Sequence, residues 1–74
     1  MNWSQIISNR TPVKTKDRAN CGYVAGEYRD NFLIIEGRFV SNEYMIPKNK
    51  VENYDGTQLS LVMRHDEIND DFKI

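Results

Sequence analysis

Pro47 interrupts a stretch, EYMIPKNKVENYDG (residues 43–56), whose alternating apolar residues otherwise predict a continuous β-strand. Proline has no N–H to donate to a β-ladder, so the strand must end at Pro47 or lie at an edge there. The polar Lys48-Asn49-Lys50 that follows suits a single helical turn, and Val51 begins a new strand. We therefore expect the chain to turn a corner after Pro47.

Period-two alternation predicts further short strands before and after this corner, at residues 13–15, 22–29, 32–36, 37–40, 43–46 and 51–53, with a last strand that contains Leu59 and Leu61. Tight turns separate them, and Tyr54-Asp55-Gly56 reads as a three-residue hairpin loop with Gly56 in a left-handed conformation. A small sheet of this kind removes its exposed edges by closing on itself. The expected fold class is all-β, a small and strongly bent antiparallel β-barrel of five or six strands.

The expected hairpin registers assign one face of each strand to the core. A loop at Asp30-Asn31 sets Arg29 opposite Phe32, which places Leu33 and Ile35 inside and turns Phe32 and Ile34 outward. A turn at Ser41-Asn42 adds Phe39, Tyr44 and Ile46 to the core, and the Gly56 loop pairs Val51 with Leu59.

The two ends of the chain flank one expected domain, residues 1–74, with the barrel at residues 12–63. Trp3, Ile6 and Ile7 have helical spacing, so residues 1–11 are expected to form a short helix or lid that Pro12 ends. Residues 64–74 (RHDEINDDFKI) are expected to form an acidic tail, either a helical turn or frayed.

Composition narrows the class of protein. The chain has 74 residues, a net charge of −1 and one cysteine, Cys21, so an internal disulfide is excluded and Cys21 is expected to be a small buried hydrophobe. Neither a signal peptide nor a membrane span is expected, and the expected location is the cytoplasm. The acidic balance disfavours a general nucleic-acid binder, which needs many phosphate contacts.

The turn and core residues resemble those of the PRC-barrel family over residues 12–63. The matching positions are Val13, Asp17, Gly22 and Val24, then Tyr44, Ile46 and Pro47, then Val51, Asp55, Gly56, Leu59 and Leu61. Arg18 stands where the family has glycine after the first aspartate. The resemblance implies a small barrel that acts as a non-catalytic protein–protein interaction module and often self-associates. It implies no active-site residue.

An apolar second face is the first candidate site. The expected registers direct five apolar side chains away from the core, and a contiguous apolar patch usually marks an interface. These candidate interface residues are Tyr23, Phe32, Ile34, Val40 and Met45. Two readings stay open: the surface binds a partner, as a homodimer or with another protein, or the N-terminal helix covers it.

A basic patch is the second candidate site, formed by Lys14, Lys16, Arg18, Lys48 and Lys50. Small barrels bind RNA through such patches, which makes an RNA- or ribosome-associated protein the alternative function. Protection of exposed strand edges by charged side chains explains the same residues and is favoured here.

The remaining polar residues indicate no catalytic chemistry. His65, the only histidine, lies in a run with Asp66 and Glu67 that reads as solvated surface. Asp66, Glu67, Asp70 and Asp71 lack the spacing and the turn glycine of a calcium loop. We therefore expect no enzyme, no cofactor and no metal ion.

Overall fold

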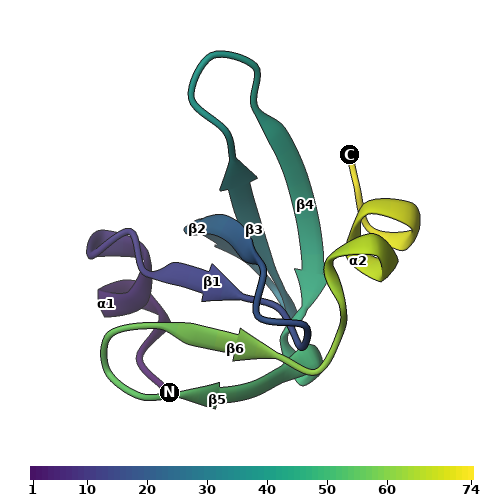
Figure 1. The fold of residues 1–74 in the computed structure, drawn as a ribbon. Coiled ribbons are helices and arrows are strands. Elements are labelled where there is room, and N and C mark those ends of the chain that lie inside the picture. Colours follow the sequence, from purple (N-terminus) through teal and green to yellow (C-terminus); the bar gives the residue numbers. More distant parts are fainter.

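Six short strands form one sheet in the computed structural model, which describes residues 1–74 (Figure 1). Their order across the sheet is β4-β3-β2-β1-β6-β5. The bounds are β1 Pro12–Lys14, β2 Asn20–Tyr28, β3 Asn31–Glu36, β4 Asn42–Pro47, β5 Val51–Tyr54 and β6 Leu59–Leu61. All neighbours are antiparallel except β1 and β6, which run parallel.

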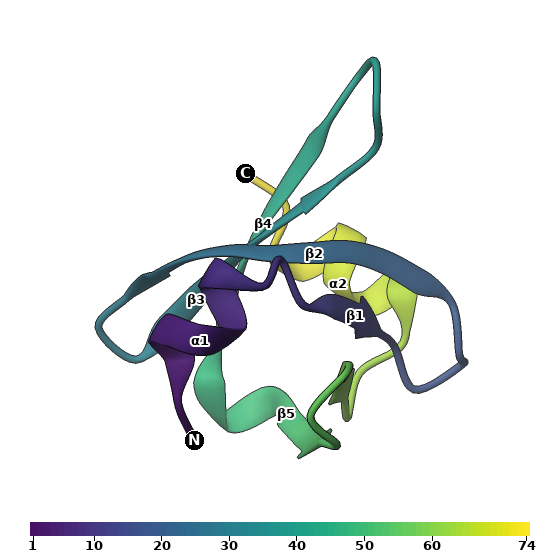
Figure 2. The ribbon, with the colours of Figure 1, turned by 90° about the vertical axis from the view of Figure 1, so that its left-hand side faces the viewer.

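The sheet is strongly bent but open. In Figure 2, β2 arches over one side of the molecule while β5 lies opposite. No ladder joins the two end strands, β4 and β5, so the predicted mainly-β fold is confirmed whereas closure into a barrel is not. The predicted corner is confirmed: β4 ends at Pro47, and a single 3₁₀ turn, η1 (Lys48–Lys50), leads into β5.

The predicted N-terminal helix is present as α1 (Trp3–Ser8). The Asn2 side chain caps it by accepting a hydrogen bond from the Gln5 N–H at 3.2 Å. Ile6 is fully buried, and the Trp3 ring lies 4.9 Å from the Phe32 ring, centroid to centroid. The helix thereby covers part of the concave side of the bent sheet (Figure 2).

The C-terminal segment forms α2 (His65–Asp71) and then adds to the edge of β4. Ile68 is buried against the core, and the Met45 N–H donates to the Phe72 carbonyl at 3.1 Å. The Ile74 N–H donates to the Glu43 carbonyl at 2.9 Å, so these two bonds satisfy donors and acceptors that an edge strand would otherwise expose. Neither helix has the length and hydropathy that crossing a bilayer requires.

The hydrophobic core lies on the concave side, between the sheet and the two helices. Its members are Ile6, Val13, Cys21, Val24, Phe32, Ile34, Tyr44, Ile46, Leu59, Leu61, Met63 and Ile68. Every buried side-chain polar atom has a hydrogen-bond partner.

The predicted register of the β2–β3 hairpin is wrong. The loop is Arg29-Asp30, with Arg29 at φ 54°, and Tyr28 pairs with Asn31. A bulge at Ala25 then lets Val24 pair with Ile34. The extra residue reverses the inward and outward alternation of the side chains along β2.

As a consequence, the two faces of β3 are exchanged relative to the prediction. Phe32 and Ile34 are fully buried, whereas Leu33 and Ile35 are half-buried on the outer face. The predicted faces are wrong because the prediction assumes one unbroken alternation along β2 and omits the bulge at Ala25.

The other two hairpins also differ from their predicted registers. Residues 37–41 form the loop between β3 and β4, and Phe39, predicted to lie in the core, is 98% exposed. Tyr44 and Ile46 are buried as predicted. Val51 pairs with Leu61 instead of Leu59, because the β5–β6 loop is four residues long, Asp55 to Gln58, and the register then shifts by one residue between Asn53 and Val51.

The predicted left-handed Gly56 is confirmed, with φ 95°. Asp55 closes this loop: its Oδ1 accepts bonds from the Thr57 N–H at 2.8 Å and from the Gln58 N–H at 2.8 Å. These bonds hold the pKa of Asp55 below its usual value.

Candidate functional site

The outward face of β2, β3 and β4 carries four apolar side chains, Tyr23, Leu33, Ile35 and Met45. Tyr23 pairs directly with Ile35, and Leu33 pairs with Met45. All four are half-exposed, and none belongs to the core cluster or packs against it. We call this set the outer apolar face.

The structure therefore changes which residues can belong to the predicted interface. Phe32 and Ile34 are fully buried and cannot contact a partner. Tyr23 and Met45 lie on the outer apolar face, where Leu33 and Ile35 take the places of the two buried residues. Helix α1 packs on the opposite, concave side, so it does not cover this face.

Val40, the fifth predicted interface residue, lies apart from this face. It sits beside Phe39 in the loop at the tip of the β3–β4 hairpin, which projects from the body of the molecule (Figure 1). Phe39 is 98% exposed and Val40 is 83% exposed. This apolar tip is a second exposed apolar surface.

The predicted basic patch divides into two places. Lys14, Lys16 and Arg18 line an open hollow of about 290 Å³ beside β1 and β6. The rest of its lining is Thr15, Glu52, Gln58, Ser60 and Leu61. The hollow is therefore polar and mainly cationic, and it contains no aromatic side chain.

The other two predicted basic residues do not line the hollow. Lys48 forms an ion pair with Glu27 and lies 5.1 Å from the centre of the Trp3 ring, so it tethers α1 to the end of the β2–β3 hairpin. Lys50 belongs to η1, and its carbonyl accepts a bond from the Val62 N–H at 2.9 Å.

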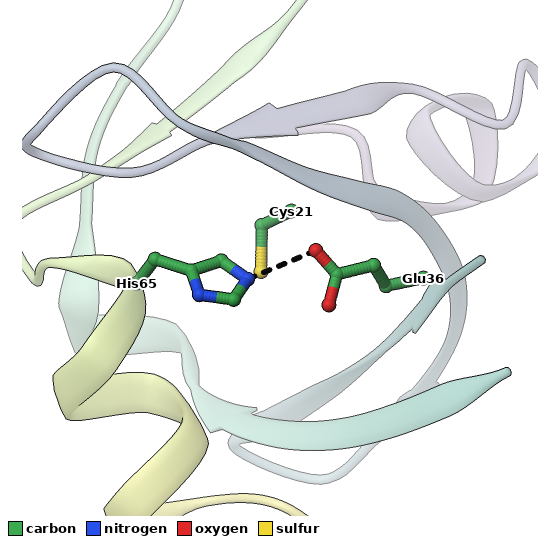
Figure 3. A group of neighbouring side chains, drawn as sticks. All are labelled: Cys21, Glu36 and His65. Atoms are coloured by element: carbon green, nitrogen blue, oxygen red, sulfur yellow. Dashed lines mark hydrogen bonds and ion pairs between the residues drawn. The ribbon is translucent and has the colours of Figure 1, made fainter.

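A third group joins residues that are far apart in the sequence: Cys21 at the start of β2, Glu36 at the end of β3 and His65 at the start of α2. Their ligand atoms, the Cys21 Sγ, a Glu36 carboxylate oxygen and a His65 ring nitrogen, all lie within 4.8 Å of one another. The His65 Nε2 lies 2.9 Å from the Glu36 Oε2. Figure 3 shows the three side chains pointing toward one another.

Gly22 allows β2 and β3 to meet closely at this point. It has φ 85°, and a Cβ there would overlap the Ile35 carbonyl group and lie 2.8 Å from the Glu36 Cα. Only glycine fits both conditions, so Gly22 places Cys21 against Glu36.

Two contacts position His65 and Glu36. The His65 N–H donates to the Asp17 Oδ1 at 3.4 Å, a long bond that ties the start of α2 to the β1–β2 turn. The Tyr44 hydroxyl donates to the Glu36 Oε1 at 2.8 Å, which leaves Oε2 free to face His65. Tyr44 is fully buried, and burial together with this bond raises the pKa of its phenol.

Cys21 is unsuited to act as a free nucleophile. It is fully buried, and burial, followed by the nearby carboxylates of Glu36 and Asp17, raises the pKa of its thiol to about 12. A reactive cysteine needs the opposite, a lowered pKa and access to solvent.

Sequence reasoning missed this group. It placed His65 in a solvated surface run, whereas the histidine side chain is 33% exposed and bonded to Glu36. The three residues stand at no recognisable motif spacing, so only the tertiary contacts of β2, β3 and α2 bring them together.

Comparison of the chain with known protein families, curated proteins and solved structures gave no match.

Proposed function

We propose that this domain is a non-catalytic protein–protein interaction module that self-associates within a cytoplasmic complex. One observation carries the proposal: the outer apolar face consists of two directly paired cross-strand contacts, Tyr23 with Ile35 and Leu33 with Met45, on three adjacent strands. A contiguous apolar patch outside the core usually marks an interface.

A second copy of the chain is the occupant that we favour. Two copies related by a two-fold axis would place each outer apolar face against the same face of the other copy. The edge of the face carries charges of both signs: Glu43 is exposed, and the Arg10 guanidinium lies 5.9 Å from the centre of the Tyr23 ring. An apolar centre with a polar rim is the usual composition of an interface.

Membership of the PRC-barrel family is part of this proposal. Arg18, which stands where that family has glycine, has φ 63°, the left-handed conformation that glycine adopts easily. Gly22 and Gly56 also have positive φ, and Pro47 ends its strand. These turn positions support the likeness, and a docking role is what that likeness implies.

Replacing Leu33 and Ile35 together with threonine is expected to weaken self-association by about 10-fold or more, equivalent to about 1.4 kcal/mol or more of binding free energy. Threonine has a β-branched shape that suits a strand, but it carries a hydroxyl that the interface would desolvate. Sedimentation equilibrium over a wide concentration range measures the effect, and circular dichroism checks that the sheet is retained.

Val62→Thr is the matched control, because Val62 is an exposed apolar residue beyond β6 and outside the face. It should leave the dimer constant unchanged. Phe39→Ser tests the apolar tip in the same way. A wild-type chain that stays monomeric at high concentration, or a dimer that only Phe39→Ser disrupts, would overturn self-association through this face.

An RNA- or ribosome-associated role is the second candidate function, and the hollow lined by Lys14, Lys16 and Arg18 favours it. Three cations at one hollow suit phosphate groups, although the lining lacks an aromatic platform on which bases stack. This role is therefore ranked below protein interaction.

The double variant Lys14→Gln/Lys16→Gln is expected to weaken any binding of single-stranded RNA and to reduce the slope of its salt dependence by about 0.7 for each phosphate that is no longer neutralised. Fluorescence anisotropy at several salt concentrations measures both quantities. Lys73→Gln, which removes an exposed lysine outside the hollow, is the control. Absence of binding at low salt, or an equal effect of the control, would exclude this role.

A further inference from the structure

We propose that Cys21, Glu36 and His65 form a binding site for a zinc ion, held by one sulfur, one oxygen and one nitrogen atom from β2, β3 and α2. The proposal is independent of self-association, because Cys21 lies on the concave side of the sheet. It also revises the expectation, from sequence alone, that the chain binds no metal.

The donor set selects the type of ion. Thiolate, imidazole and carboxylate are the three ligand types that zinc sites in proteins use. Mg²⁺ and Ca²⁺ require oxygen ligands and would leave the sulfur and nitrogen unused. Zinc is therefore the divalent ion that these residues fit.

The geometry is close to that of a bound state. Zinc bond lengths of about 2.0–2.3 Å place tetrahedral ligand atoms about 3.5 Å from one another. Here the three ligand atoms lie within 4.8 Å of one another, with Nε2 and Oε2 2.9 Å apart. Shifts of about 1 Å or less around a central ion would thus convert the contact between His65 and Glu36 into two coordinate bonds.

Binding of zinc requires that the Cys21 sulfur and the His65 Nε2 each lose their proton. Zinc is coordinated by the Cys21 thiolate, so the thiol proton is released to solvent. In the metal-free protein the His65 Nε2 carries the hydrogen that faces the Glu36 Oε2, so this proton must also leave Nε2. A neutral ring shifts it to Nδ1 by exchange with solvent, and the Nε2 lone pair then coordinates the ion. The Glu36 carboxylate contributes an oxygen without changing its charge. No oxidant or reductant is involved.

The surroundings already orient two of the ligands. The Tyr44 hydroxyl donates to the Glu36 Oε1, the kind of outer hydrogen bond that fixes a metal-binding carboxylate. The Asp17 carboxylate accepts from the His65 backbone N–H. The two side chains that an ion meets first, His65 and Glu36, are 33% and 23% exposed, whereas Cys21 closes the inner end. An ion can therefore enter from solvent and still reach the sulfur.

Titration of the reduced 74-residue chain with Co²⁺, a spectroscopic substitute for zinc, tests the proposal directly. Cys21 is the only cysteine and His65 is the only histidine, so a thiolate-to-cobalt charge-transfer band can arise from one sulfur only. We expect this band to saturate at one ion per chain, together with the visible bands of a tetrahedral ion, and to disappear when Zn²⁺ is added.

Variants assign the ligands. Cys21→Ser should abolish the charge-transfer band, and His65→Gln and Glu36→Gln should each weaken Co²⁺ binding by about 100-fold or more. Tyr44→Phe, which removes only the positioning bond, should weaken binding by about 10–100-fold. Asp70→Asn is the control, because Asp70 is an exposed acidic residue of α2 outside the group. It should bind as the wild type does.

Three results would each contradict the proposed zinc site. The proposal fails if the folded wild-type protein shows no charge-transfer band at millimolar Co²⁺, or if His65→Gln binds as tightly as the wild type. Saturation at one ion for two chains would also refute it, because that ratio indicates ligands shared between molecules. Should Cys21→Ser not fold, the partly exposed His65 and Glu36 variants still decide the question.

Discussion

Replacing Phe32 with alanine is expected to destabilise the domain by about 3–5 kcal/mol. Phe32 is fully buried in the core, and its ring packs on Trp3. A domain of this size has a total stability of about 5 kcal/mol, so the variant should retain only about 0–2 kcal/mol, and up to about half of it should be unfolded at 25 °C. Urea unfolding followed by circular dichroism measures the change.

Leu33→Ala is the matched control, because Leu33 is the next residue of the same strand but lies on the outer face. It should cost about 1 kcal/mol in the monomer, since only partly buried area is removed. Measurements at low protein concentration separate this cost from any effect on self-association. A larger loss of stability for Leu33→Ala than for Phe32→Ala would show that β3 is inserted with its other face inward.

Gly22→Ala is expected to have an effect of similar size, for a different reason. The added Cβ would overlap the Ile35 carbonyl group, at 2.7 Å from the carbonyl carbon, and the residue would keep φ 85°. The atoms that must move belong to the backbone of the central β2–β3 pair and cannot give way as a flexible side chain does. Thermal unfolding should therefore show a loss of several kcal/mol, with total loss of the fold as the upper limit.

Two other glycines allow the cost of positive φ to be separated from the cost of the steric overlap. Gly56 has φ 95° but open space around it, so Gly56→Ala should cost only the conformational strain, about 1–2 kcal/mol. At Gly26, which does not have positive φ, a new Cβ would meet Leu33 at an ordinary 3.8 Å, so Gly26→Ala should be close to neutral. If Gly22→Ala were no worse than Gly56→Ala, the close approach of β2 to β3 would be wrong.

Local chemistry made several elements predictable from the sequence. Pro47 removes a donor from the ladder, and the chain turns there wherever the sheet lies in space. Gly56 follows Asp55 in a short polar loop and takes the left-handed conformation expected of it. Trp3, Ile6 and Ile7 define a helical stripe that does not depend on its partner. In each case the deciding interactions lie within a few residues.

The registers could not be predicted in the same way, because one residue decides each of them. Arg29 adopts a left-handed conformation that its side chain disfavours, and Ala25 is the extra residue of a bulge. Neither residue type signals its role. The loop at Arg29-Asp30 moves the partner of Gly26 by two residues, from Ile35 to Leu33, which keeps the predicted faces. The bulge moves the pairing by one residue, and a one-residue shift exchanges the inner and outer faces of a strand. That is why simple alternation places the apolar residues of β3 on the wrong sides, and with them Phe32 and Ile34, two of the five predicted interface residues.

Local patterns were sufficient to predict a mainly β domain, its corner at Pro47, the left-handed Gly56 and the N-terminal helix, because strand alternation and turn chemistry act over a few residues. Only the tertiary structure decided which apolar residues form the core and which form the outer apolar face. It also decided that Cys21, Glu36 and His65 meet, since their contact depends on a parallel β1–β6 pair, a glycine-permitted approach of β2 to β3, and the docking of α2. Contacts between distant segments reflect the packing of the whole chain, which no local pattern specifies.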